Sequence, residues 1–385
     1  MTQFTFNTTP SIIFGAGSIA KIGAIAAERI GQRILVVSDA GLMKAGLVTP
    51  VMAALQAAGI SASVFDDVTA DPPEAIVMAA VEAGRLHNAT GVIGLGGGSS
   101  LDVAKLVALL LCSGEALHAI YGVGNAKGPR LPLMLIPTTA GTGSEVTPIS
   151  IVTTGAYEKK GVVSPVIVPD IALLDPELTS GLPPHVTAAT GIDAMVHAIE
   201  AFTSASPNNN PVSRSLAKEA LALLGAHILR SVSHGADLEA RSGMLLGSML
   251  AGQAFANSPV AAVHALAYPI GGVFHVPHGL SNALVLPEVI RFNADVCGRE
   301  YAELAAILFP VMAGLNEEKR ASGFAPRLAA LSLEIGLPPR LRDLDIPADA
   351  LPHLASEAMK QKRLLVNNPR TVTEADALAI YKAAW

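Results

Sequence analysis

The chain is poor in cysteine, aromatic side chains and long apolar runs. Only two of its 385 residues are cysteines, and neither has a CxxC partner, so a disulfide framework is not expected. We expect Cys112 and Cys297 to be buried structural thiols in a reducing cytoplasm. Aromatic residues make up 4% of the chain. No stretch approaches about 18 uncharged apolar residues, so a membrane protein is not expected.

Clusters of positive charge are also missing. The net charge is −6, and no stripe or block of Lys and Arg is present, which argues against a nucleic-acid partner. The first residues, MTQFTFNTTPSIIF, have neither a basic region nor a long apolar core, so we expect no signal peptide. The expected location is therefore the cytoplasm.

The first half of the chain alternates between two kinds of segment. Short β-branched runs such as SIIF, ILVVSD, SASVFDD, GVIGLGG and LMLIPTT are separated by segments with helical periodicity. This alternation predicts βαβ units and a parallel sheet. Between about 145 and 175 the pattern becomes strand, turn and strand.

The character of the chain changes near residue 183. After Pro183 and Pro184, almost every segment has helical spacing, and no convincing strand is found. A chain of this length favours two domains. We therefore predict an α/β domain over 1–182 and an all-helical domain over 183–385.

Two glycine-rich loops are candidates for holding a dinucleotide. GAGSIA at 15–20 fits G-x-G-x-x-A, and Asp39 ends a predicted strand about twenty residues later, but an Ala- and Gly-rich chain produces this match easily. GLGGGSS at 94–100 follows a central strand and runs into a helix whose N-terminus favours an anion. Ser99 can add a hydroxyl there, and Ser100 can cap the helix. The second loop has the stronger physical case.

A third polar loop, PTTAGTGSE at 137–145, directly follows the strand LMLI. It offers four hydroxyls at the carboxyl end of a parallel strand, where ligands of open α/β sheets bind. The hydroxyls belong to Thr138, Thr139, Thr142 and Ser144.

A metal site is indicated by Asp193 and His197, which lie at i and i+4 on a predicted helix, about 6 Å apart on one face. His264 and His278, in HALAYPIGGVFHVPH, can complete a set of three nitrogens and one oxygen, or of two and two. We expect the Pro-Ile-Gly-Gly segment to break the chain between these histidines. Such a set suits Fe, Zn, Co or Ni and does not suit Ca or Mg. Glu200 is expected to face solvent or to pair locally.

Four motifs in order resemble the iron-containing (group III) alcohol dehydrogenases over nearly the whole chain. They are GGGSSLDVAK, PTTAGTGSEVTP, TAATGIDAMVHAIEAF and VHALAYPIGGVFHVPHGLSNALVLP. The resemblance implies a dehydroquinate synthase-like fold with an N-terminal NAD-binding domain and a C-terminal metal-binding domain. It also implies hydride transfer between NAD(H) and a small alcohol or aldehyde in the cleft between the domains. In this scheme GAGSIA is a decoy.

The resemblance also implies individual site residues. The implied ligands of Fe²⁺, or of Zn²⁺, are Asp193, His197, His264 and His278. The residues implied to line the cofactor site are Asp39, Gly96, Gly97, Gly98, Ser99, Asp102, Thr138, Thr139, Thr142, Ser144 and Lys159. A carboxylate at Asp39 repels a 2′-phosphate, so NAD is favoured over NADP, and Lys160 is expected to point away from the cofactor.

One position departs from the family pattern. Many members carry HALAH, whose second histidine is thought to relay protons, whereas this chain has Tyr268 there. A phenol, with an ordinary pKa near 10, is a poorer proton shuttle at neutral pH than an imidazole. Tyr268 and His275 are both candidate catalytic residues.

The same departure keeps a second activity open. In having a tyrosine at this position, the chain resembles the transhydrogenase-like and hydroxyacid-related branch of the family. A hydroxyacid–oxoacid transhydrogenase or a hydroxyacid dehydrogenase is therefore the alternative enzyme. An alternative of another class is a metal or nucleotide sensor without catalysis. The resemblance further implies a homo-oligomer, most simply a dimer.

Overall fold

The computed structural model describes residues 3–155 and 158–385, which form two compact units. One unit comprises Asn7–Thr139 and Gly143–Ser180. The other comprises Gly181–Trp385 together with Ala140–Thr142 and the described residues up to Phe6. The predicted boundary at 182 assigns these last two segments to the first domain.

The first unit is built on a parallel sheet of six strands in the order β1-β9-β6-β4-β2-β3. The strands are β1 (Ser11–Phe14), β2 (Arg33–Val37), β3 (Ser61–Phe65), β4 (Gly91–Gly96), β6 (Leu133–Pro137) and β9 (Ile171–Leu174). Every pairing in this sheet is parallel. The predicted parallel sheet is therefore confirmed.

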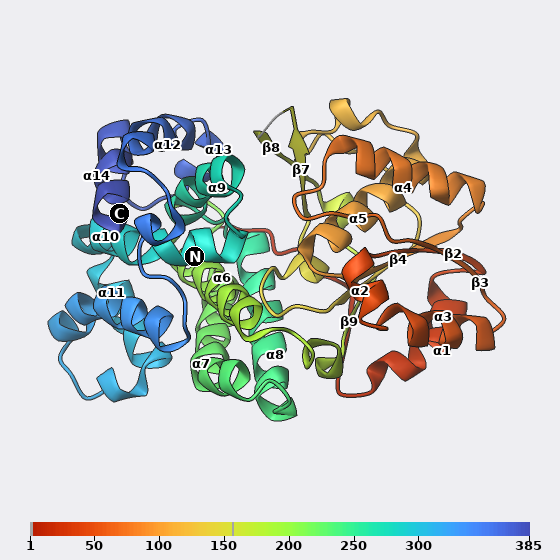
Figure 1. The fold of residues 1–385 in the computed structure, drawn as a ribbon, viewed down its shortest axis with the longest axis horizontal. Coiled ribbons are helices and arrows are strands. Elements are labelled where there is room, and N and C mark those ends of the chain that lie inside the picture. The colour runs from red at the N-terminus through yellow and green to blue at the C-terminus, as the bar shows by residue number, and fades with distance from the viewer. Residues whose placement is uncertain (1–2, 156–157) are drawn as a thin grey trace. The chain divides into compact units, whose positions relative to one another are not determined.

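Successive residues of the central strands are buried on opposite faces of the sheet. Ile34 and Val36 of β2 belong to a core with α1 (Ile22–Arg29) and α3 (Val48–Ala57). Leu35 and Val37 belong to a second core with α4 (Glu74–Leu86) and α5 (Gly98–Ser113). Figure 1 shows these helices around the strands. Strands covered on both faces must be apolar at every position, which explains continuous runs such as ILVV.

The chain reverses direction across the sheet between β2 and β4. From β2 it moves outward to β3, whereas from β4 it moves to β6 on the other side. Ligands of open α/β sheets bind at the carboxyl ends of the strands at such a switch point. A separate three-stranded sheet follows, formed by β5 (Gly122–Val123), β7 (Ile149–Thr154) and β8 (Glu158–Val163).

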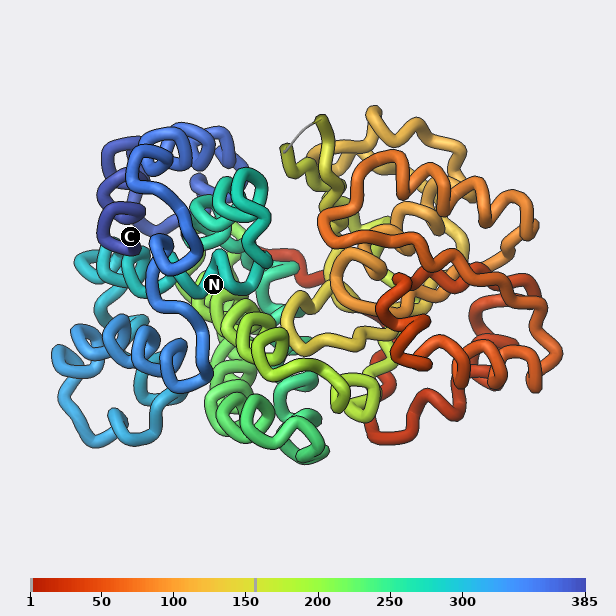
Figure 2. The backbone as a smooth tube through the Cα atoms, in the orientation of Figure 1, coloured from red at the N-terminus to blue at the C-terminus, as the bar shows by residue number. Residues whose placement is uncertain are grey.

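The second unit is helical, and no strand occurs among its described residues. Figure 2 follows its chain from α6 to the C-terminal α14. The longer helices are α6 (Pro184–Thr203), α7 (Pro211–Ser233), α8 (Leu238–Asn257), α9 (Ala262–Phe274), α10 (His278–Leu308), α11 (Glu317–Glu334) and α14 (Glu374–Ala384). The shorter ones are α12 (Leu351–Ala358) and α13 (Lys362–Leu365), while α2 (Ala40–Lys44) belongs to the first unit. Within the described chain, no helix combines the length and the apolarity that a membrane crossing requires.

Two local expectations are wrong. The Pro-Ile-Gly-Gly segment does not break the chain, because α9 continues through Pro269 to Phe274. The break comes later, where His275 adopts a left-handed conformation (φ 56°) and Pro277 caps α10. Cys297 is buried as expected, but Cys112 is exposed near the end of α5. The apolar neighbours of Cys112 face the core, while the thiol lies on the outer side of the helix.

Candidate functional site

Helix α6 places Asp193 and His197 one turn apart in the interior of the helical unit. Asp193 is 2% exposed and His197 is 5% exposed. Buried groups of this polarity require partners. Their partners come from α9 and α10, which lie far along the sequence.

Asp193, His264 of α9 and His278 of α10 form a cluster whose potential ligand atoms all lie within 4.8 Å of one another. Asp193 Oδ1 lies 3.6 Å from His278 Nε2 and 3.9 Å from His264 Nε2. Ligand atoms about 3.4 Å apart are expected around a tetrahedral metal ion with bonds near 2.1 Å. The side chain of His278 is 41% exposed, so the cluster is accessible from that side.

His197 adjoins this cluster through ring stacking. Its ring centroid lies 4.8 Å from that of His264 and 4.3 Å from that of Phe255 on α8. Its Nδ1 lies 3.1 Å from the carbonyl oxygen of Gly141, which accepts the ring N–H and leaves Nε2 as the basic nitrogen. Burial lowers the pKa of His197 to about 3, although Asp193 opposes this shift. The imidazole is therefore neutral, as a metal ligand must be.

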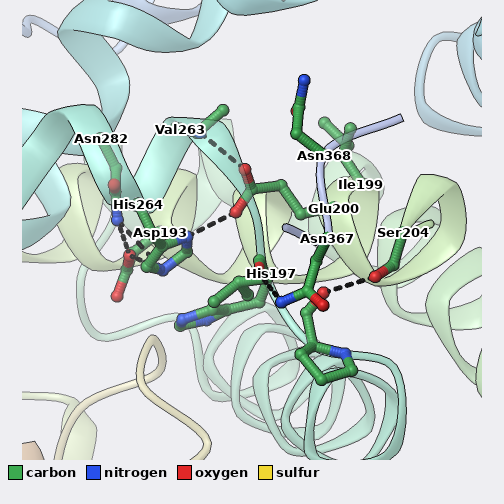
Figure 3. Close-up of polar contacts among 12 residues, drawn as sticks. Asp193, His197, Ile199, Glu200, Ser204, Val263, His264, Asn282, Asn367 and Asn368 are labelled. Carbon is green, nitrogen blue, oxygen red and sulfur yellow. Dashed lines mark hydrogen bonds and ion pairs between the residues drawn. The ribbon is translucent and has the colours of Figure 1, made fainter. Parts of the chain in front are cut away.

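Glu200 orients the imidazole of His264. Its Oε2 accepts the Nδ1–H of His264 at 2.6 Å, and its Oε1 accepts the backbone N–H of Val263 at 2.7 Å (Figure 3). This carboxylate fixes the tautomer of His264 and leaves Nε2 as an electron-pair donor. The expectation that Glu200 faces solvent or pairs locally is wrong, because it is 4% exposed and its partners are 63 and 64 residues away.

The charge state of Asp193 follows from its surroundings. Burial alone would raise its pKa, but the positive charge that the imidazoles of His197, His278 and His264 carry when protonated, together with a hydrogen bond from Asn282, lowers it overall. The carboxylate is therefore ionised at neutral pH. Asp193, His264 and His278 converge, and a carboxylate with imidazoles is a donor set that Fe²⁺ and Zn²⁺ favour. The residues thus fit a divalent transition metal.

The two candidate catalytic residues lie at different places on α9. Tyr268 is on the same helix one turn after His264, and its ring centroid lies 5.8 Å from that of His278. His275 is exposed and caps the C-terminal end of α9.

In the first unit, the glycine run lies at the switch point of the sheet. Gly96 ends β4 with φ 153°, and Gly97 caps α5 without any side-chain hydrogen bond. A Cβ on Gly96 would lie 2.7 Å from the side chain of Ser100, so a larger residue does not fit. Helix α5 begins at Gly98, so its first N–H groups and its dipole suit a phosphate. The loop therefore fits a dinucleotide pyrophosphate.

Asp39 lies beside this loop at the end of β2. Its Oδ1 caps α2 by accepting the N–H of Leu42 at 3.0 Å, and its Oδ2 accepts the hydroxyl of Ser100 at 3.4 Å. The expectation that Ser100 caps α5 is wrong, because this hydroxyl points to Asp39. The bond joins the N-cap of α2, which follows β2, to the first turn of α5, which follows β4.

Asp102 and Ser144 belong to a buried network centred on Lys105. Ser144 Oγ donates to Asp102 Oδ1 at 2.5 Å, and the backbone N–H of Ile151 donates to Oδ2 at 2.9 Å. Lys105 Nζ donates to Ser144 Oγ at 2.8 Å, to Thr147 Oγ1 at 3.1 Å and to Asp102 at 3.4 Å. Burial lowers the pKa of Lys105, and the Asp102 charge opposes this shift. Lys105 stands in the LDVAK segment, but no spacing to another functional residue predicted that it belongs to the site.

The other predicted cofactor residues belong to different segments of the fold. Thr138 is buried directly after β6, and Thr139 is half-buried next to it, whereas Thr142 belongs to the helical unit. Lys159 on β8 forms an ion pair with Asp71 at 2.6 Å and is 10% exposed. The side chain of Lys160 is 42% exposed.

The first glycine loop is occupied by the chain's own carboxylate. Asp175, at the end of β9, accepts the backbone N–H of Gly17 at 3.2 Å and that of Ile19 at 3.0 Å. These donors would otherwise attract a phosphate. These bonds make GAGSIA a structural loop, in line with the expectation that it does not bind the cofactor.

Comparison with known proteins places these features in one family. The model described as "Iron-containing alcohol dehydrogenase" matches residues 9–176, and the model described as "Fe-containing alcohol dehydrogenase family, C-terminal" matches residues 187–385. The chain belongs to the iron-containing alcohol dehydrogenase family. It is 42% identical to long-chain-alcohol dehydrogenase 1 of Geobacillus thermodenitrificans over 367 residues, which cover 93% of this chain and 91% of that protein.

Solved structures of an oxidoreductase and a reductase share the fold of the chain. A 1,3-propanediol oxidoreductase superimposes with a TM-score of 0.95 at 33% identity, and the match covers all of both chains. A sulfoacetaldehyde reductase from Bifidobacterium kashiwanohense, solved in complex with NAD⁺, has a TM-score of 0.88 at 29% identity and is matched over 100% of this chain and 99% of that chain. The predictions of the family, the two-part fold and an alcohol dehydrogenase-type oxidoreductase are confirmed.

Proposed function

We propose that the protein transfers a hydride between NAD(H) and a small alcohol or aldehyde with the help of a divalent metal, Fe²⁺ or alternatively Zn²⁺. The proposed metal ligands are Asp193, His197, His264 and His278. The proposal is supported most directly by the Asp193–His264–His278 cluster, in which an ionised carboxylate and imidazoles oriented for binding converge.

The proposed cofactor residues are those of the glycine loop and its neighbours. They are Asp39, Gly96, Gly97, Gly98, Ser99, Asp102, Thr138, Thr139, Thr142, Ser144 and Lys159. When bound, NAD(H) supplies the hydride or accepts it, and the metal ion supplies Lewis acidity to the substrate oxygen. The protein contributes binding and orientation through the rigid loop at Gly96 and the buried network around Lys105.

Proton transfer is assigned to Tyr268, with His275 as the second candidate. The support for Tyr268 is its ring position beside His278, the exposed member of the cluster. Its Oη would donate a proton to the substrate oxygen during aldehyde reduction and accept it during alcohol oxidation. A Tyr268→Phe variant with an unchanged pH–rate profile, together with a slowed His275→Ala variant, would shift this role to His275.

The metal proposal is tested by reconstitution. Protein stripped with a chelator is reloaded anaerobically with Fe²⁺ or with Zn²⁺, and NADH oxidation is followed with a panel of aldehydes. We expect activity only after reloading, and we expect His264→Ala to lose both metal and activity. The matched control His234→Ala, an exposed histidine in the loop after α7, should retain both. Equal activity with and without metal would contradict the proposal.

The cofactor preference is tested at Asp39. Asn keeps an oxygen that accepts the Leu42 N–H but removes the negative charge that repels a 2′-phosphate. We expect Asp39→Asn to lower KM for NADP at least tenfold relative to KM for NAD. An unchanged ratio would remove Asp39 from the specificity determinants.

Tyr268 in place of histidine supports one alternative, a hydroxyacid–oxoacid transhydrogenase. In that activity NAD remains bound while two substrates exchange the hydride. Turnover with free NAD and an alcohol favours the dehydrogenase, and turnover only with a paired oxoacid favours the transhydrogenase.

We also propose domain limits of 1–182 and 183–385, a cytoplasmic location and a homodimer. The domain limits are supported by the division of the two compact units between Ser180 and Gly181. The cytoplasmic location is supported by two free cysteines, because reduced thiols are typical of that compartment. Light scattering coupled to size-exclusion chromatography tests the dimer.

A further inference from the structure

Asn282 lies among the proposed metal ligands. It follows His278 by one turn of α10 and is fully buried. Its amide nitrogen Nδ2 lies 2.6 Å from Asp193 Oδ1, 3.3 Å from His278 Nε2 and 3.4 Å from His264 Nε2. Figure 3 shows this amide pointing at the Asp193 carboxylate.

The neighbours of this amide are atoms that accept hydrogen bonds. Asp193 Oδ1 carries negative charge, and His264 Nε2 bears a lone pair because its Nδ1–H is donated to Glu200. Electron pairs that converge in a buried site repel one another. The amide N–H of Asn282 offsets this repulsion, and its shortest bond goes to the carboxylate.

The other end of the same amide has no such partner. Among the described residues, no hydrogen-bond donor reaches the buried Oδ1 of Asn282. An unpaired buried carbonyl is unfavourable, so an apolar side chain of similar size would suit a position that only fills space. The amide is therefore explained by what its nitrogen does.

We propose that Asn282 is a positioning residue of the metal centre. Its N–H···Oδ1 bond fixes the rotation of the Asp193 carboxylate, so that Oδ1 stays close to the Nε2 atoms of His264 and His278. This role rests on the proposed function, because the residues it positions are the proposed ligands. Loss of such a supporting bond typically weakens metal binding by about 10- to 100-fold.

The test is a metal-affinity measurement that does not depend on turnover. Asn282→Leu keeps the approximate volume of the side chain and removes the hydrogen-bond donor. If this variant does not fold, Asn282→Ala removes the donor without introducing a clash. Zn²⁺ and Co²⁺ affinities are measured by competition with a chromophoric chelator, and the visible spectrum of bound Co²⁺ reports ligand geometry. We expect affinity to fall about 10- to 100-fold and the Co²⁺ spectrum to change.

A matched control lies on the same helix. Asn293 is also a buried asparagine of α10, but its amide exchanges hydrogen bonds with Asn368, at 3.0 and 2.8 Å, instead of bonding to a proposed ligand. We expect Asn293→Leu to lower the melting temperature and leave the metal affinity unchanged. If the Asn282 variants also bound metal as tightly as the wild type, the positioning role would be wrong. A wild-type protein that bound no divalent metal would instead overturn the proposed function.

Discussion

At the scale of single residues, Glu145 gives the protein a specific pH dependence. It is 1% exposed, and burial raises its pKa to about 7, against the opposing effects of its own backbone N–H and of Lys105. Because the folded-state pKa lies above the ordinary value of about 4.5, the folded protein binds more protons than the unfolded chain between these values. Stability is therefore unaffected below pH 4.5 and falls as pH rises through 7.

The size of this effect can be measured with Glu145→Gln. A shift of about 2.5 pKa units corresponds to roughly 3 kcal/mol, which is an upper value for the stability that Glu145 removes at high pH. Between pH 5 and pH 8.5, the free energy of unfolding measured in urea should decrease less for Glu145→Gln than for the wild type. The same change at the exposed Glu28 should leave the wild-type decrease intact. An equal decrease in the free energy of unfolding for the wild type and Glu145→Gln would show that Glu145 does not cause this pH dependence.

At the scale of elements, the C-terminal helix α14 supports the helix that carries His264. The hydroxyl of the fully buried Tyr381 donates to the carbonyl oxygen of Leu266 on α9 at 2.6 Å. Pro269 lacks an N–H, so α9 already has fewer internal hydrogen bonds than a regular helix. The bond from Tyr381 therefore steadies a weakened helix.

Tyr381→Phe removes only this hydroxyl. We expect a loss of about 1 kcal/mol in the free energy of urea unfolding, the usual net value of one hydrogen bond. Hydrogen exchange should accelerate in α9 and remain unchanged in β4 and β6. An unaltered exchange rate in α9 would mean that the hydroxyl does not steady that helix.

Elements also explain what the sequence could reveal. Strands such as ILVV were predictable because a sheet covered on both faces demands apolar residues at every position. The course of α9 was not predictable, because a proline and two glycines usually end a helix. Here the helix continues past them, and the chain turns only at His275 and Pro277. Asp193 and His197 share one helix, so their pairing was readable from spacing. Glu200 and Asn282 were not readable, because their roles depend on partners far along the chain.

At the scale of the whole molecule, each compact unit has its own buried residues, and the proposed metal ligands lie in one unit while all of the proposed cofactor residues except Thr142 lie in the other. Multidomain proteins often unfold in more than one step, and a ligand stabilises the part that binds it. We expect calorimetry to resolve two transitions, one raised by Zn²⁺ and the other by NADH. In Asp193→Ala, the transition raised by Zn²⁺ should no longer move. A single transition that both ligands raised equally would show that the units unfold as one.

The carboxylate of Asp175 in the first glycine loop bears on stoichiometry. A chain with two glycine-rich loops at strand ends could be expected to take up two nucleotides. Because the backbone donors of Gly17 and Ile19 already hold a covalently attached anion, a phosphate would have to displace a group that cannot diffuse away. An equilibrium titration should therefore count one dinucleotide per chain.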